Sequence, residues 1–173
     1  PSERDFLELA HSIYLAYLAR IEATSEDDFD GLLQAAADRI RSGACLFERK
    51  NRIGDIATLT YLCIDEFQDF SALFHRLLEA MQHANPSMQT FCVGDDWQAI
   101  NGFAGSDLRF FHDFNHYIGP GDQLHLSTNY RSARSIVEIG NRVMRGLGQP
   151  ARASSTLEGK VLLVDQARFS PVT

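Results

Sequence analysis

The sequence predicts an α/β fold in which helices flank a parallel sheet. Two short apolar runs, Tyr61–Ile64 and residues 90–93, have the length and composition of buried strands. A helical pattern separates them, and strands that alternate with helices form parallel sheets through crossover connections. With 45% hydrophobic and 23% charged residues over 173 positions, the composition is that of an ordinary globular chain and excludes a disordered tail.

Apolar residues at helical spacing predict the helices around these strands. The first helix follows a capping pair, Ser2 and Asp5, and extends to Ile21. The others are expected at Phe29–Arg41 (Leu32, Leu33, Ala36 and Ile40 on one face, Gly43 as its stop), at 71–83 before Asn85-Pro86, from Ser106 (burying Leu108, Phe111 and Phe114), and at 132–147.

The remaining segments are expected to be connections and two further strands. Residues 45–58 are mixed and charged, which predicts irregular structure, and residues 119–121 form a Gly-Pro-Gly turn. Residues 149–158 have the composition of a linker. Short apolar runs predict strands at 124–126 and 161–164.

Charge and cysteine content exclude several classes of protein. A net charge of −7 argues against a protein that simply coats nucleic acid. No apolar run reaches the roughly 18 residues of a membrane span, so no membrane partner is expected. The three cysteines are odd in number and lack CxxC spacing, which favours buried free thiols in a reducing compartment. Arginines gather between residues 127 and 152, which suits either phosphate contacts or a solvated basic helix face: Arg131, Arg134, Arg142, Arg145 and Arg152.

Acidic pairs follow both predicted strands, Asp65-Glu66 after the first and Asp95-Asp96 after the second. Parallel sheets bind ligands at the carboxyl ends of their strands. One carboxylate there can hold hydrated Mg²⁺, and a second can orient or deprotonate a water molecule. Two other interpretations remain open: acids in ordinary turns, and a two-metal site for a nuclease or nucleotidyltransferase.

These residues resemble the motifs of one enzyme family. Residues 61–71 (YLCIDEFQDFS) are similar to the Walker B segment, motif II, of UvrD/Rep-type superfamily 1 DNA helicases. Residues 93–107 (VGDDWQAINGFAGSD) resemble motif III, in the form typical of the helicase IV-like subgroup, and residues 126–132 (LSTNYRS) resemble motif IV. Residues 28–33 (DFDGLL) resemble the short segment that precedes motif II. The motifs occur in the family's order and spacing.

The resemblance implies an incomplete RecA-like P-loop NTPase fold. Neither Lys50 nor Lys160 lies in a GxxxxGK[ST] sequence, so the Walker A loop is missing. We therefore expect an internal fragment, with residues 1–126 as the later part of the first motor domain and 127–173 as the beginning of the second. The fragment alone is expected not to hydrolyse ATP, and its partner would be the remainder of the helicase chain.

The resemblance also implies roles at a site for ATP and Mg²⁺. Asp65 would hold Mg²⁺ through water, and Glu66 would be the base that activates the attacking water. Gln98 would sense the γ-phosphate and link it to DNA. The other residues assigned to the nucleotide are Gln68, Asp69 and Asp95 in the supporting network, Tyr130 stacked on adenine, and Arg131 as the arginine finger on the γ-phosphate.

Single-stranded DNA and duplex junctions are the partners that the resemblance implies, with movement from 3′ to 5′ in the cytoplasm of a bacterium. Phe103 would stack on a base, and Gly102 and Gly105 around it favour an exposed loop. Trp97 and Asn101 would also lie at the DNA. Asn101 and Ala104 replace residues that the family often has as Tyr and Arg, which weakens the expected contact. A non-catalytic DNA- or protein-binding module derived from a helicase is an alternative.

Overall fold

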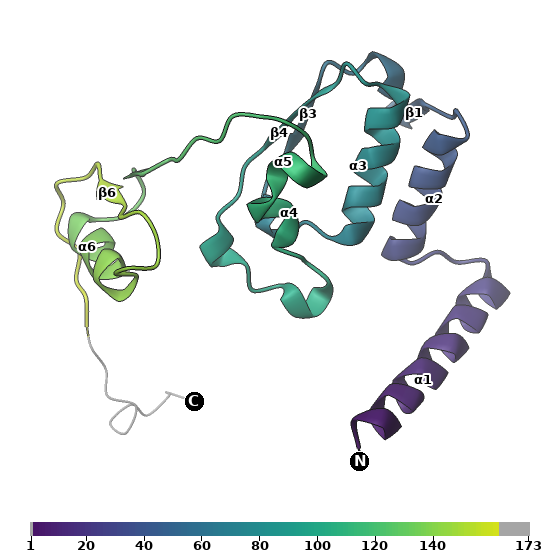
Figure 1. Cartoon of the computed structure of the whole chain (residues 1–173), viewed down its shortest axis with the longest axis horizontal. Helices are drawn as coiled ribbons and strands as arrows, with labels where there is room; N and C mark the ends of the chain where they lie inside the picture. Colours follow the sequence, from purple (N-terminus) through teal and green to yellow (C-terminus); the bar gives the residue numbers. More distant parts are fainter. Residues whose placement is uncertain (1, 163–173) are drawn as a thin grey trace. The chain divides into compact units, whose positions relative to one another are not determined.

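The computed structural model describes residues 2–162, which form two compact units that divide after Gly121. Figure 1 traces both along the chain. The first unit contains helices α1, α2 and α3, a hairpin and a parallel strand pair. The second unit contains α6 between two short strands.

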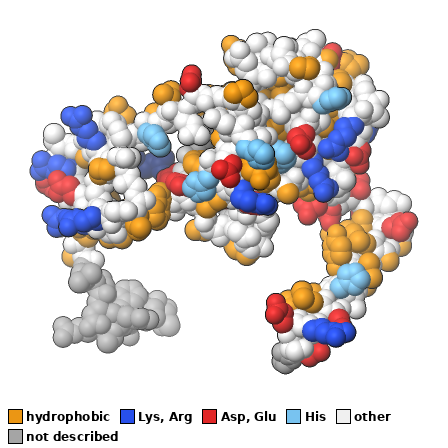
Figure 2. All heavy atoms as spheres, viewed as in Figure 1, with side chains coloured by type: hydrophobic (Ala, Val, Ile, Leu, Met, Phe, Trp, Pro, Cys, Tyr) orange, Lys and Arg blue, Asp and Glu red, His pale blue; other side chains and the backbone are white. Residues whose placement is uncertain are grey.

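Two helices open the first unit, as predicted. Helix α1, Glu3–Thr24, begins with a capping box between Ser2 and Asp5, and α2, Phe29–Arg41, is capped by Asp28. Hydrogen bonds from the Gly31 amide and the Tyr17 hydroxyl hold the pKa of the Asp28 carboxyl below its ordinary value. Helix α1 buries none of its residues, and Figure 2 shows its apolar side chains at the surface. No helix within residues 2–162 is both long and apolar enough to cross a membrane.

Helix α2 packs against α3, Ala72–Ala84, and the two run side by side in Figure 1. Their contact is a small buried cluster of Ala37, Ile40, Ile56 and Ala80. Small alanine side chains let the two helix backbones approach closely. Leu32, expected on the buried face, is exposed instead, because the buried stripe runs through Ala37 and Ile40.

A βαβ unit forms the centre of the first unit. Strand β3, Tyr61–Ile64, and strand β4, Gln89–Cys92, pair in parallel, and α3 connects them. The predicted strands and the parallel pairing are confirmed. The main core lies under one face of this pair: Phe67, Phe70, Leu78, Met88, Phe110 and Ile118.

The prediction that both strands are buried on both faces is wrong for the described residues. Leu62 and Ile64 are half-buried, whereas Tyr61 and Cys63 on the opposite face are exposed. The cause is that the core covers only one face of the two-stranded sheet. All three cysteines are free, but the prediction that they are buried is wrong, because Cys63 is exposed and Cys45 and Cys92 are half-buried. Partial burial raises the pKa of the Cys92 thiol to about 12.

Residues 45–58 contain an antiparallel hairpin, so the prediction of irregular structure there is wrong. Strands β1, Leu46–Arg49, and β2, Arg52–Asp55, are joined by Lys50 and Asn51, which both have positive φ (50° and 61°). Two such residues in succession form the turn that matches the twist of a hairpin. Gly54 faces the Phe47 ring so closely that a Cβ would lie 2.3 Å from it.

The single helix expected from Ser106 is broken into α4, Arg109–His112, and α5, Phe114–Tyr117. Asp113 between them has φ −102° and ψ 40°, outside the helical region. The break brings Phe110 onto the core, where its ring stacks on His75 at a centroid distance of 4.8 Å. The spacing predicted that Leu108, Phe111 and Phe114 are buried. They are half-buried, so this prediction holds only in part.

The second unit is also a strand–helix–strand arrangement. Strand β5, Thr128–Asn129, pairs in parallel with β6, Arg152–Ala153, and α6, Arg134–Val143, lies between them in sequence. The strand predicted at 124–126 is absent from this described segment, and Leu126 is 91% exposed. The helix predicted over 132–147 is shorter at both ends. Residues 161 and 162 form no strand, and residues 163 and 164 of that prediction lie outside the described residues.

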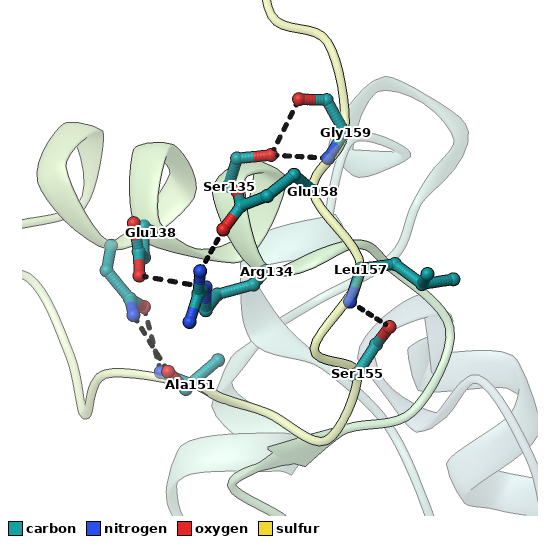
Figure 3. Close-up of polar contacts among 9 residues, drawn as sticks. Arg134, Ser135, Glu138, Ala151, Ser155, Leu157, Glu158 and Gly159 are labelled. Atoms are coloured by element: carbon teal, nitrogen blue, oxygen red, sulfur yellow. Dashed lines mark hydrogen bonds and ion pairs between the residues drawn. The ribbon is translucent and has the colours of Figure 1, made fainter.

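Residues 149–158 are not a free linker, because side chains of α6 bind residues within this segment and the glycine that follows it. Figure 3 shows Ser135 hydrogen-bonded to both the amide and the carbonyl of Gly159, and Arg134 paired with Glu158. Asn141 makes two hydrogen bonds of 2.8 Å to the backbone of Ala151. These contacts join the segment to α6.

Replacing Asn85 with alanine is expected to lower the free energy of unfolding by about 1–3 kcal/mol. The Asn85 side chain is 4% exposed and donates to the carbonyls of Ile56 and Leu59 at 2.9 and 2.8 Å. The Leu59 carbonyl would lose this donor, and the Ile56 carbonyl would keep the longer hydrogen bond from the Leu59 amide at 3.2 Å. Urea unfolding of the chain measures the change, with the exposed Asn115→Ala as the matched control. An equal loss in both variants would contradict this assignment.

Candidate functional site

The two acidic segments lie next to each other, at the carboxyl ends of β3 and β4. The Val93 amide donates to the Ile64 carbonyl at 2.9 Å, and the Phe67 amide donates to the Val93 carbonyl at 2.8 Å. The parallel pairing therefore continues beyond the strands and holds Asp65-Glu66 beside the loop of residues 94–98. This edge is where parallel sheets place their ligand sites.

Asp65 and Glu66 are both exposed at the start of a tight turn. The Glu66 amide donates to Asp65 Oδ1 at 2.9 Å, and Glu66 has φ 52° and ψ 44°, the left-handed conformation. A non-glycine residue in that conformation costs about 1–3 kcal/mol and is found mainly where the surroundings impose it. The turn continues as a 3₁₀ helix, Phe67–Asp69, and Phe67 packs into the core directly after the two acidic residues.

The Gln68 side chain lies between the two loops and forms a hydrogen bond with each. This side chain is buried, with 3% of the residue exposed. Its Nε2 donates to Glu66 Oε2 at 2.7 Å, and its Oε1 accepts from the Asp95 amide at 3.0 Å. One neutral amide thus contacts a predicted catalytic carboxylate on one side and the 94–98 loop on the other.

Asp95 continues this network to Gln98. Its Oδ2 accepts from Gln98 Nε2 at 2.7 Å, and its Oδ1 accepts from the Trp97 amide at 3.1 Å. Both Asp95 and Gln98 are exposed. The result is a continuous chain of hydrogen bonds that runs from Glu66 through Gln68 and Asp95 to Gln98.

The donor set of this edge fits a single hydrated Mg²⁺ better than a two-metal centre. Within residues 2–162 no group of three or more His, Cys, Asp or Glu side chains is placed to hold a metal ion. Mg²⁺ bound with a nucleotide needs only one or two carboxylates, because water and phosphate oxygens complete its coordination. Asp65 supplies one exposed carboxylate of that kind.

A cleft of about 450 Å³ lies beside β3, with Asp65, Glu66 and Asp69 among its lining residues. Asp69 is half-buried, and its Oδ1 is a buried atom without a hydrogen-bond partner among the described residues. A buried acceptor of this kind normally has a donor. Asp69 is therefore available to a donor from a ligand or from another part of the protein.

The segment predicted to meet DNA presents two aromatic side chains to solvent, Phe103 and Trp97. Phe103 is 91% exposed on a 3₁₀ turn, Gly102–Ala104, as the flanking glycines predicted. Asn101 is half-buried, and its carbonyl accepts from the amides of Ala104 and Ser106. Trp97 is exposed in the 94–98 loop, ahead of this turn.

Tyr130 and Arg131 belong to the second unit, where they follow β5. The Asn129 side-chain oxygen accepts from the Arg131 amide at 3.0 Å and from the Ser132 amide at 2.8 Å. This local turn leaves Tyr130 79% exposed and Arg131 exposed. Arg131 forms no ion pair with any residue of the described chain.

Two positioning residues were missed by the sequence interpretation. Asn129 was noted only as part of a motif, although asparagine commonly bonds to the backbone two residues on. Gly94 was not singled out, and a Cβ there would lie 2.7 Å from Gln68 Oε1 and 3.0 Å from the Phe111 ring. Only tertiary structure reveals that second contact.

Together, the βαβ unit and the acidic loops at its carboxyl edge define an α/β protein with a candidate site where parallel sheets commonly bind ligands. Residues 1–118 match the family model of the UvrD/REP helicase N-terminal domain. The chain therefore belongs to the UvrD/REP helicase family, and the resemblance drawn from motifs II, III and IV is confirmed.

Curated relatives agree with this assignment. The chain is 29% identical to DNA helicase IV of Escherichia coli (strain K12) over 168 residues, which cover 94% of this chain and 23% of that protein. It is 30% identical over 164 residues to the ATP-dependent DNA helicase UvrD2 of Mycobacterium tuberculosis (strain ATCC 25618 / H37Rv), covering 92% and 22%. The putative ATP-dependent DNA helicase YjcD of Bacillus subtilis (strain 168) is 28% identical over 145 residues, covering 84% and 18%. The chain thus spans about a fifth of the length of these relatives.

Proposed function

We propose that this chain is part of an ATP-dependent DNA helicase that couples ATP hydrolysis to 3′-to-5′ movement on single-stranded DNA and to unwinding at duplex junctions. The observation that supports this most directly is the hydrogen-bonded path from Glu66 through Gln68 and Asp95 to Gln98. It joins the segment that resembles Walker B to the segment that resembles motif III. The names of the relatives, which are DNA helicases, support the same function.

In this proposal Asp65 and Glu66 have different roles in hydrolysis of the γ-phosphate of ATP. Asp65 holds a hydrated Mg²⁺, which would neutralise charge on the phosphates. Glu66 accepts the proton of the attacking water, and its exposed position at the strand end lets water reach it. Gln98 contacts the γ-phosphate with its amide, which can both donate and accept. Asp69 and Asp95 position these groups.

The second unit contributes Tyr130 and Arg131 to the same reaction. Tyr130 stacks on the adenine ring, for which its exposed ring is suited. Arg131 stabilises the negative charge that develops on the γ-phosphate in the transition state. The absence of an acidic partner for Arg131 among residues 2–162 supports a guanidinium that is free to meet a phosphate.

Phe103 is the proposed contact to a DNA base, with Asn101 and Trp97 on either side of it in the same segment. Stacking of a base on an aromatic side chain is worth about 1–3 kcal/mol and tolerates any base. The exposure of Phe103 supports this role. A soluble bacterial motor acting on DNA in the cytoplasm is part of the proposal.

A second candidate function is a binding module without catalysis, because the sequence has no GxxxxGK[ST] loop. The presence of Asp65, Glu66, Gln98 and Arg131 together argues for the motor, since binding alone does not require this set. Assays of ATP hydrolysis and of unwinding distinguish the motor from the binding module.

We expect the 173-residue chain to show no ATP hydrolysis, whereas a complete protein that contains it together with a Walker A segment hydrolyses ATP when single-stranded DNA is added. Steady-state phosphate release from both proteins measures this, with unwinding assayed on duplexes with a 3′ or a 5′ tail. Turnover by the chain that disappears in its Glu66→Gln variant would contradict the expected inactivity. A complete protein that binds DNA but neither hydrolyses ATP nor unwinds would favour the binding module.

A further inference from the structure

Gln68 is the one polar side chain that is buried between the two loops of the candidate site. Both ends of its amide are engaged, Nε2 with Glu66 Oε2 at 2.7 Å and Oε1 with the Asp95 amide at 3.0 Å. With 3% exposure it has no surface left for a ligand. Its contribution must therefore act through the two groups that it contacts.

We propose that Gln68 is a positioning residue that fixes the Glu66 carboxylate and couples it to the 94–98 loop, so that the position of this loop sets the position of the base. The inference deepens the proposed function and depends on it. The motif resemblance placed Gln68 in the network that supports the nucleotide site, and the two hydrogen bonds give it a specific role there.

The geometry requires this residue type. Glutamine offers a donor and an acceptor on one rigid amide, so it can bind a carboxylate and a backbone N–H at the same time. Glutamate at this position would keep an acceptor for the Asp95 amide but would have no hydrogen to donate to Glu66, and would bring two carboxylates together. Methionine, which has a similar length, would lose both hydrogen bonds.

Gly94 closes the space around the Gln68 amide from the other loop. A Cβ on Gly94 would lie 2.7 Å from Gln68 Oε1, 3.0 Å from the Gln68 backbone nitrogen and 3.0 Å from the Phe111 ring. The bare Cα of Gly94 thus allows the Asp95 amide to reach Gln68. Alanine at position 94 perturbs the same hydrogen bond from the opposite side, without touching Glu66.

The coupling extends to the segment that presents Phe103. The Asp95 carbonyl accepts from the Gln98 amide at 2.9 Å, and the turn at Gly102–Ala104 follows a few residues later. A DNA base bound at this segment would act on the 94–98 loop, and Gln68 would pass the displacement to Glu66. Misplacing a catalytic group by about 1 Å can lower a rate about 10²-fold.

The test compares Gln68→Met and Gly94→Ala in the complete DNA-stimulated protein. Matched controls are Gln82→Met, which removes a half-buried amide that donates to the Ile118 carbonyl, and Gly140→Ala on α6, where nothing lies within 4 Å of the added Cβ. We expect both test variants to lower the DNA-stimulated kcat by about 10²-fold. The nucleotide Kd and the single-stranded DNA Kd should stay near wild type, and the ratio of the DNA-stimulated to the basal rate should fall towards one.

Three results would overturn the inference. The first is a wild-type stimulation ratio in Gln68→Met, the second is a loss of ATP binding in parallel with the rate, and the third is an equal effect of the control variants. A Glu66→Gln protein measured alongside distinguishes the failures. If that protein still hydrolyses ATP, the proposed function itself fails. If it is inactive while Gln68→Met retains stimulation, only the role of Gln68 is rejected.

Discussion

Replacing Glu66 with glutamine in the complete protein is expected to lower kcat for ATP hydrolysis by about 10²–10⁴-fold, the usual contribution of a general base. Glutamine preserves the size of the side chain but cannot take a proton from water. Because Asp65 and the strand ends are unchanged, the Kd for ATP should stay within a few-fold of wild type. Single-turnover hydrolysis together with equilibrium nucleotide binding measures the two quantities separately.

The matched control is Glu48→Gln, the same substitution at an exposed position of β1. It should leave both hydrolysis and binding unchanged. Wild-type turnover in the Glu66→Gln protein would refute the assignment of the base and point to another group at the strand ends. A parallel loss of nucleotide binding would show that Glu66 acts mainly on Mg²⁺ or on the fold of its turn.

Replacing Arg131 with alanine is expected to lower kcat by about 10³–10⁵-fold, the range found for arginine fingers in phosphoryl transfer. The turn held by Asn129 would persist, because its hydrogen bonds use the backbone amides of Arg131 and Ser132. The side chain is therefore removed without a change in the loop. Arg131→Lys keeps the charge but loses the planar fork, so its rate should lie between those of wild type and alanine.

Arg142→Ala is the control for this prediction. Arg142 lies on α6, is exposed, and forms no ion pair within the described chain. Its removal should affect DNA affinity at most, with a reduced salt dependence. If Arg131→Ala also changed only DNA affinity, Arg131 would belong to the basic surface of the second unit, and the charge on the γ-phosphate would have to be stabilised by a different residue.

Sequence patterns predicted the elements that depend on regular burial. Helices α2 and α3 bury one face each, and the spacing of their apolar residues follows from that. Strands β3 and β4 were located by their continuous apolar runs, although the core covers only one face of the pair. The hairpin at 46–55 depends instead on positive φ at Lys50 and Asn51. No glycine marks that turn, so composition alone gave no signal. Strand β5 has only two residues and was misplaced onto the more apolar residues before it.

The candidate site divides in a similar way. Acidic residues after the strands, and their proximity at one sheet edge, were predicted from topology and from the motifs. The functions of Gln68, Gly94 and Asn129 depend on contacts between loops or on the exact backbone of a turn. Such contacts have no periodicity in the sequence. They become visible only when the two loops are placed side by side.

The turn after β5 has a mechanical consequence for the proposed motor. Asn129 lies in a strand paired with β6, and the same side chain binds the backbone on both sides of the Arg131 peptide. The Ser154 amide also donates to the Asn129 carbonyl. These hydrogen bonds thus hold the backbone that carries Tyr130 and Arg131. A displacement of the second unit would move these two side chains with it, because the hydrogen-bonded turn leaves their backbone little freedom to move separately.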